Sequence, residues 1–179
     1  MRKLLFQSDD YGLTDSVADG ILKGIDQGII RNTGLFVNMP SSARAAEKIR
    51  DRQGICVGID INLVAGRPVS DPAEVPSLVN PEGHFVPSVQ RMREGRIIGR
   101  QGMCLCFEED PYNYEQTLLE TDNQVKRFIE LMGRKPDYFH GHSMATPNTQ
   151  KAARAIAEKY DILMTTDVMS GSQVSMIPC

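Results

Sequence analysis

The sequence has no cluster of basic residues and no long apolar run, and each absence excludes a class of protein. A formal net charge of −3 and an isoelectric point near 5.6 argue against a nucleic-acid partner, which needs Lys and Arg gathered on one face. Near the start, only residues 4–6 are apolar before polar residues return, which is too short for a signal peptide or a membrane span. We therefore expect a cytoplasmic protein with no nucleic-acid or membrane partner.

Paired cysteines are also absent. The four cysteines show no C-x-x-C spacing, which argues against a tetrahedral zinc site and predicts reduced thiols. Cys56 is expected in the core. The 179 residues suffice for one α/β domain with its own core, so we expect a single domain over residues 1–179.

Short apolar runs alternate with amphipathic segments along the chain. The pattern predicts strands at 3–8, 33–39, 55–61, 136–142 and 162–166, and helices at 16–29, 42–52, 113–133 and 149–161. Thr14, Asp15 or Ser16 can cap the first helix, and Gly133 can end the third. Residues 62–111 are rich in Pro and Gly and predict a long loop with one short helix. Continuous apolar strands with helical connections are typical of an α/β fold with a parallel sheet.

Polar side chains follow several of these strands at their carboxyl ends. Asp9 and Asp10 close the first strand, Asp60 lies late in the third, and His140 and His142 close the strand after the long helix. In parallel α/β sheets and barrels this edge binds ligands, so distant residues can converge there. Carboxylates with imidazole predict a site for a divalent cation.

Each of these residues also has an ordinary structural explanation. Asp9 and Asp10 could cap a turn, share a proton as a catalytic pair, or act as a metal ligand beside a general base. Asp60 lies among apolar residues and could instead form a structural salt bridge. His142 could be a loop histidine, and His84, beside Gly83, is a turn residue that could also touch a substrate.

Several segments resemble, in order and spacing, the YdjC-like carbohydrate deacetylases, the family that includes the chitooligosaccharide deacetylases. The resemblance covers nearly the whole chain and is carried by "SDDYGLTDSVADGILKGIDQGII", "NTGLFVNMP", "VGIDINLVAGRPVSDP", "PSLVNPEGHF" and "ETDNQVKRFIELMGRKPDYFHGH". It implies a barrel-like (β/α) deacetylase domain, often dimeric, that removes N-acetyl groups from amino sugars with a divalent metal, magnesium or zinc. By the same resemblance Asp10 and His142 match metal ligands and Asp9 matches the general base.

The chain departs from the family pattern in two places. Where the family has G-x-H-x-N, this sequence has "GIDIN", so Asp60 stands at the position of a histidine ligand. Asp60 could bind a metal through oxygen, abolish metal binding, or favour another ion. The chain also ends at "QVSMIPC", where family members continue, so we expect the C-terminal part of the barrel to be lacking.

The leading expectation is metal-assisted hydrolysis of an acetamide, with Asp9 as base, Asp10, Asp60 and His142 as metal ligands, and His140 and His84 near the substrate. Three alternatives remain open at this point. One is a sugar-binding or regulatory relative that has lost its metal, another is a metal hydrolase of a different amide or a phosphoester, and the third is a structural protein whose acids only form ion pairs. A homodimer with a small carbohydrate substrate is the expected assembly.

Overall fold

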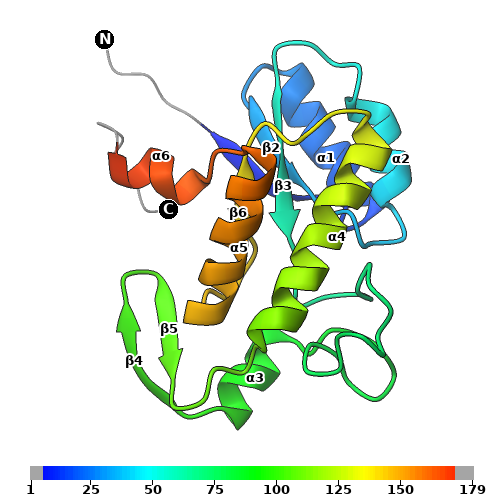
Figure 1. Ribbon diagram of the computed structural model, residues 1–179. Coiled ribbons are helices and arrows are strands. Elements are labelled where there is room, and N and C mark those ends of the chain that lie inside the picture. The colour runs from blue at the N-terminus through cyan, green and yellow to red at the C-terminus, as the bar shows by residue number, and fades with distance from the viewer. Residues whose placement is uncertain (1–5, 172–179) are drawn as a thin grey trace.

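The computed structural model describes residues 6–171 (Figure 1). Four parallel strands form one sheet in the order β1-β2-β3-β6, and β4 and β5 form a separate antiparallel hairpin. The strands are β1 (Gln7–Tyr11), β2 (Asn32–Leu35), β3 (Cys56–Ile61), β4 (Ile97–Gln101), β5 (Cys104–Phe107) and β6 (Phe139–Gly141). The helices are α1 (Asp15–Asp26), α2 (Ser42–Ile49), α3 (Ser88–Glu94), α4 (Tyr114–Met132), α5 (Pro147–Tyr160) and α6 (Thr165–Gly171). The predicted α/β class with a parallel sheet is confirmed.

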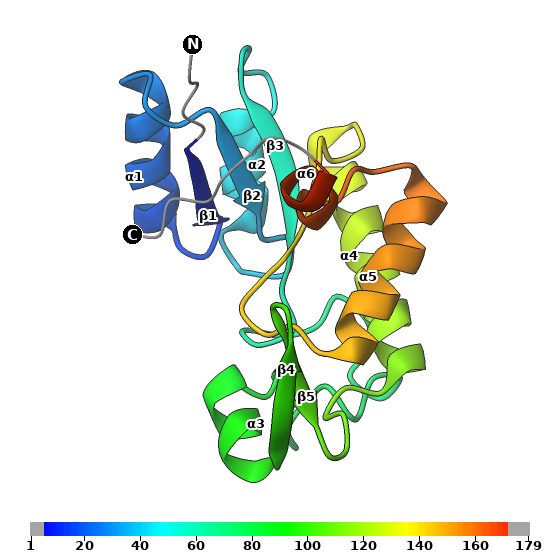
Figure 2. The same ribbon diagram turned by 90° about the vertical axis from the view of Figure 1, so that its left-hand side faces the viewer.

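The sheet is covered by helices on one side. Figure 2 shows the strands in front of α2 and α4, whereas α6 lies on the viewer's side of the sheet. Buried apolar side chains fill the space between strands and helices, among them Leu35, Ile59, Val125 and Phe128. Burying each such side chain contributes roughly 1.5–3 kcal/mol, so this layer holds the strands in place.

The helix ends follow the chemistry of the sequence. Thr14 caps α1 by accepting a hydrogen bond from the Val17 N–H at 3.2 Å, and Gly133 ends α4 in the left-handed conformation. Within residues 6–171, none of the helices is both long and apolar enough to cross a membrane.

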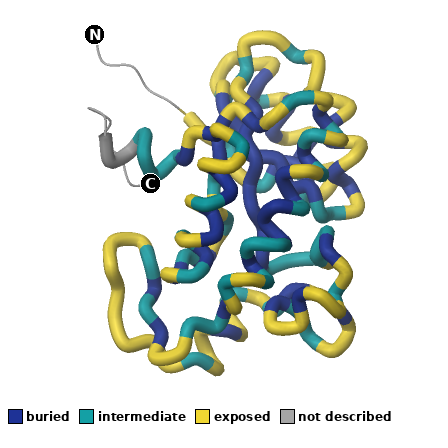
Figure 3. Tube along the Cα trace, viewed as in Figure 1, coloured by how far each residue is buried: buried dark blue, intermediate teal, exposed yellow. Residues whose placement is uncertain are grey.

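Three expectations about elements were wrong. The first strand was predicted at 3–8, of which residues 3–5 lie outside the described residues, and β1 runs on through the acidic pair to Tyr11. The run predicted as a strand at 162–166 forms a single bridge, Phe139 to Met164, before α6 begins. The predicted loop at 62–111 contains the expected short helix, α3, but also the β4–β5 hairpin. The hairpin projects beyond the sheet and is largely exposed along β4 (Figure 3).

The cysteines give one confirmation and one correction. Cys56, Cys104 and Cys106 are free thiols, as predicted, and Cys179 lies outside the described residues. Cys56 is exposed and not part of the core, because it is the first residue of β3 and follows an exposed turn, before the strand enters the buried layer.

Candidate functional site

The acidic pair lies in an irregular part of β1. The pairing of β1 with β2 shifts register between Ser8 and Tyr11, and Asp10 adopts a left-handed backbone conformation with φ 68°. In a regular strand, neighbouring side chains point to opposite faces. A left-handed residue at a bulge breaks this alternation at a cost of about 1–3 kcal/mol, and such strain clusters at functional sites.

Asp60 is fully buried, with 0% of its surface exposed. Its Oδ2 accepts a hydrogen bond from the Asp10 N–H at 3.1 Å, and its buried Oδ1 has no hydrogen-bond partner. Burial raises the pKa of Asp60 to about 8; the Asp9 carboxylate adds to the shift and the Asp10 N–H opposes it. The salt bridge considered from the sequence does not occur among the described residues, so Asp60 is held by the backbone and its neighbours alone.

The space for this carboxylate comes from a glycine. Gly34 pairs with Gly58 between β2 and β3, and a Cβ at Gly34 would overlap the Asp60 carboxylate. A Cβ at Gly58 would likewise overlap the ring of Tyr138. The two glycines therefore leave room for an acid and a tyrosine side by side on the sheet.

His142 faces the second acid of the pair. Its Nδ1 lies 3.3 Å from Asp10 Oδ1, and its ring meets the edge of Phe36 with ring centres 4.8 Å apart. Burial lowers the pKa of His142, although the Asp10 and Asp9 carboxylates oppose the shift. The neutral imidazole that burial favours is the form that binds metals.

His140 lies on the other side of the cluster, beside the first acid. Its Nε2 is 3.8 Å from Asp9 Oδ2, and its Nδ1 is 3.0 Å from the Thr165 hydroxyl. Asp9, Asp60 and His140 each offer a ligand atom within 4.8 Å of the other two. The five residues predicted at the strand ends therefore meet at one place, and His140 lies beside the acids.

His84 is exposed and is not among the residues of this cluster. It lies in the turn 80–84, where its backbone N–H donates to the Asn80 side chain at 2.9 Å. Its predicted substrate contact stays a prediction.

Two further residues of the site had not been singled out from the sequence. Thr165 contacts His140. The buried hydroxyl of Tyr138 has no hydrogen-bond partner. Burial raises the pKa of Tyr138 most, and the charges of Asp60 and Asp9 raise it further. The period of two in a strand was the available signal for Tyr138, since it precedes His140 by two residues.

These residues fit a divalent cation. Asp10 and Asp60 each place a buried oxygen without a hydrogen-bond partner at the cluster, and two imidazoles adjoin them. A buried carboxylate oxygen without a donor is costly unless a proton or a cation satisfies it. The donor set of carboxylates and imidazoles suits magnesium, manganese or zinc.

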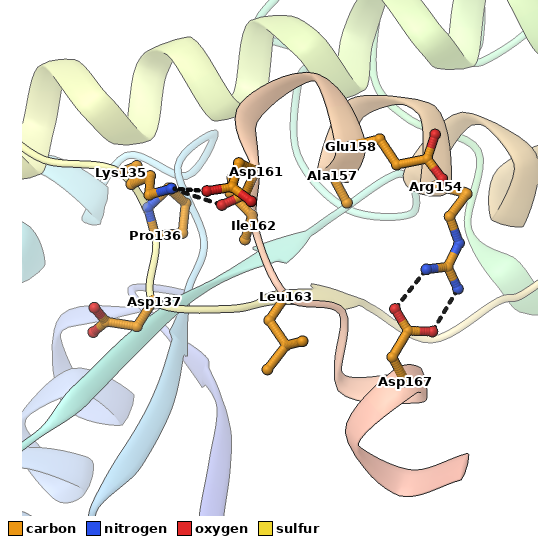
Figure 4. Close-up of a pocket in the computed structure, with 10 residues that line it drawn as sticks. All are labelled: Lys135, Pro136, Asp137, Arg154, Ala157, Glu158, Asp161, Ile162, Leu163 and Asp167. Carbon is orange, nitrogen blue, oxygen red and sulfur yellow. Dashed lines mark hydrogen bonds and ion pairs between the residues drawn. The ribbon is translucent and has the colours of Figure 1, made fainter. Parts of the chain in front are cut away.

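A separate hollow of about 640 Å³ lies at the opposite end of β6, where residues 135–137 lead into the strand (Figure 4). Two ion pairs, Lys135 with Asp161 and Arg154 with Asp167, join four of the charged side chains that line it. Their charges are thus balanced within the wall, and the hollow does not contain the cluster at the strand ends.

Comparison with known proteins agrees with the resemblance seen in the sequence. The model of the family "YdjC-like protein" matches residues 3–176. The chain is 38% identical over 173 residues to a carbohydrate deacetylase of Vibrio vulnificus (strain CMCP6), covering 96% of this chain and 61% of the relative. It is 28% identical to carbohydrate deacetylase 2 of Listeria innocua, covering 89% and 58%, and 31% identical to a chitooligosaccharide deacetylase of Escherichia fergusonii, covering 79% and 49%.

The fold has a counterpart among solved structures. A putative cellobiose-phosphate cleavage protein of Enterococcus faecalis V583 superposes with a TM-score of 0.74 at 23% identity, covering 89% of this chain and 57% of that one. The chain thus spans between about half and three fifths of the length of these relatives. With its family model matched over nearly every residue, the chain belongs to the YdjC-like protein family.

Proposed function

We propose that the chain acts in the hydrolytic removal of N-acetyl groups from amino sugars or short chitooligosaccharides, with a divalent metal. The observation that carries the proposal is the meeting of three acids and two histidines at the carboxyl ends of β1, β3 and β6, with two buried carboxylate oxygens lacking a hydrogen-bond partner. Family membership and the names of the curated relatives support it. The proposal is the metal-assisted hydrolysis that the sequence predicts.

In this proposal Asp10, Asp60 and His142 hold the cation, as the family resemblance implies. A bound divalent ion would supply a Lewis acid for the acetamide carbonyl and a lowered pKa for water. Asp9 is the general base: its side chain is 48% exposed, so it can reach a water molecule that a buried carboxylate cannot. The proton that Asp9 removes from water passes to the departing nitrogen, so one water molecule gives acetic acid and the free amine, and the acid then ionises to acetate.

The finer assignments are part of the same proposal. The carboxylates support magnesium, and the imidazoles keep zinc as the other choice. The net charge of −3 supports a carbohydrate over a nucleic acid as partner. The homodimer and the cytoplasmic location expected from the sequence stay predictions.

A second function is favoured by one observation. Asp60 already accepts a hydrogen bond from Asp10, and its raised pKa of about 8 favours a protonated, neutral acid in the absence of metal. This supports a sugar-binding relative without a resident ion as the alternative. It predicts sugar binding without release of acetate.

The test is the variant Asp9→Asn, measured by acetate release from a chitooligosaccharide and by elemental analysis of bound metal. We expect the rate to fall by about 100- to 10,000-fold, the usual contribution of a general base, with metal content unchanged. Asp51→Asn is the matched control, because the Asp51 side chain is 91% exposed. Unchanged turnover in Asp9→Asn would reject Asp9 as the base, and a parent chain with neither metal nor acetate release would favour the alternative.

A further inference from the structure

We propose that His140 is a ligand of the bound cation, held by Thr165 so that its Nε2 acts together with the Asp60 carboxylate. The inference rests on the proposed function only in requiring that the chain bind a divalent ion. It adds His140 to the ligands that the family resemblance implies. The His140 imidazole then stands beside Asp60, the acid of "GIDIN".

His140 and Asp60 lie on neighbouring strands of the sheet. β3 and β6 are parallel neighbours, and Asp60 is the register partner of His140. Register partners in adjacent strands lie side by side, at a strand spacing of about 4.8 Å, with side chains on the same face. An imidazole at position 140 therefore stands next to the carboxylate at position 60.

Thr165 contacts the other nitrogen of the His140 ring. The Thr165 hydroxyl has one hydrogen, and it donates that hydrogen to the Phe139 carbonyl oxygen at 3.4 Å. With that hydrogen on the Phe139 side, the Thr165 oxygen is the acceptor at its 3.0 Å contact with His140, and we assign the ring hydrogen of His140 to Nδ1 as part of the proposal. Nε2 is left with a free lone pair, and a second hydrogen-bonded ring nitrogen is the usual companion of a metal-binding histidine.

His140 Nε2 lies beside the acids of the site. Nε2 lies 3.8 Å from Asp9 Oδ2, which is too long for a hydrogen bond. Asp60, 0% exposed, brings a carboxylate oxygen to the same group, and its buried Oδ1 has no hydrogen-bond partner. The ligand atoms of Asp60 and His140 lie within 4.8 Å of one another, close to the separation of at most about 4.3 Å that two ligand atoms of one ion have at bond lengths of about 2.0–2.2 Å.

The test uses Mn²⁺ as the probe, with its affinity measured by the electron paramagnetic resonance of the free ion. In His140→Asn the amide keeps a donor near the position of Nδ1 but lacks Nε2. We expect its Mn²⁺ affinity to fall by more than about tenfold, the least that losing even an outer contact of a metal site typically costs. His84→Asn is the matched control and is expected to bind Mn²⁺ as the parent does, because His84 is exposed in the turn 80–84, where its backbone N–H donates to the Asn80 side chain.

A paired exchange separates ligation from general charge. His140→Asp alone should bind Mn²⁺ less tightly than the double variant Asp60→His with His140→Asp, which restores one acid and one imidazole across the same pair of strands. In pulsed resonance spectra of bound Mn²⁺, we expect one set of nitrogen couplings to disappear in His140→Asn and to remain in His84→Asn. Parental affinity and couplings in His140→Asn would overturn the inference.

Thr165→Val provides a second route if His140→Asn does not fold. Valine has nearly the shape of threonine but no acceptor for the Nδ1 hydrogen, so the ¹⁵N shifts of His140 should show loss of the Nδ1-protonated form and Mn²⁺ should bind less tightly. Unchanged shifts and affinity would count against the inference.

The outcomes also separate the inference from the proposed function. A parent chain that binds Mn²⁺ and releases acetate, with His140→Asn retaining the parental affinity, would remove His140 as a ligand and leave the function standing. A parent chain that binds no Mn²⁺ and releases no acetate would overturn both.

Discussion

Gly34 shows how one residue can decide whether the site exists. It has no role in chemistry, but the Asp60 carboxylate occupies the space that any side chain at this position would need. The variant Gly34→Ala tests this. We expect it to displace Asp60, to abolish Mn²⁺ binding and to lower the free energy of unfolding by about 1–3 kcal/mol, as overpacking typically does. Urea unfolding and Mn²⁺ titration measure the two effects.

Gly20→Ala is the matched control for this substitution. Gly20 lies within α1, and a Cβ there would meet nothing within 4 Å. Alanine is the better helix former, so the control should stabilise the protein by roughly 0.5–1 kcal/mol and leave Mn²⁺ binding unchanged. If Gly34→Ala behaved like Gly20→Ala, the account of how Asp60 is accommodated would be wrong.

The sequence identifies the residues of the site better than their arrangement. Strand-end positions predicted that Asp9, Asp10, Asp60 and the two histidines lie at one edge, and the structure brings them together. The left-handed backbone of Asp10 could not be predicted, since a bulge depends on pairing with β2. The closeness of His140 to Asp60 likewise follows from the register of β3 with β6, which one strand alone does not fix.

At the scale of elements, the predictable parts are those with a local signal. α1, α4 and α5 have caps and apolar stripes, and their positions agree with the expected ranges to within a few residues. The β4–β5 hairpin was missed because every residue of β4 is exposed. The sequence of β4 therefore shows no alternation of apolar and polar residues that would predict a strand. The last apolar run lacks a strand because its pairing with β6 is limited to one bridge.

Glu120 of α4 fixes the loop that follows β3. It is fully buried, and its two oxygens accept hydrogen bonds from the Val69 and Ser70 N–H groups at 3.0 and 2.9 Å and from the Gln124 amide at 2.7 Å. Gln124 in turn pairs with the backbone of Asn62, two residues after Asp60. The helix thereby holds the segment 62–70 at both of its ends.

The variant Glu120→Gln tests this anchor. A glutamine presents an NH₂ group where one carboxylate oxygen accepts an N–H, which leaves a buried donor facing a donor. We expect a loss of about 1–3 kcal/mol in the free energy of unfolding and faster hydrogen exchange at Val69 and Ser70. Glu130→Gln, at a side chain 64% exposed, should change stability by less than about 0.5 kcal/mol. Equal stability of the two variants would contradict the anchoring role.

At the scale of the whole molecule, the site depends on the complete sheet. Its residues run from Asp9 to His142 and come from strands that α2 and α4 cover on one side. Most ion pairs on this body are between exposed side chains, and such pairs contribute little to stability. The pairs of Asp122 differ, because its side chain is only 12% exposed.

Asp122 joins the two longest helices and makes the fold sensitive to acid. Lys126 of α4 and Lys159 of α5 each lie 2.7 Å from one of its oxygens. Burial alone would raise the pKa of Asp122, but hydrogen bonds from Lys126, Lys159 and Tyr160 outweigh it and hold the pKa below its ordinary value. A carboxyl whose pKa is lowered by folding stabilises the protein above the unfolded value, about 3.9, and this contribution is lost as the pH falls through the lower folded pKa.

The corresponding prediction is that Asp122→Asn is less stable than the parent at neutral pH and loses less stability below about pH 4, where the parent's carboxylate takes up its proton. Urea unfolding at a series of pH values measures both curves, and Asp51→Asn should follow the parent, since that side chain is 91% exposed. The stability curves of Asp122→Asn and the parent should approach each other in acid, because protonation removes from the parent's Asp122 the charge that the variant lacks. Parallel curves for Asp122→Asn and the parent would show that α4 and α5 do not depend on this charge for their contact.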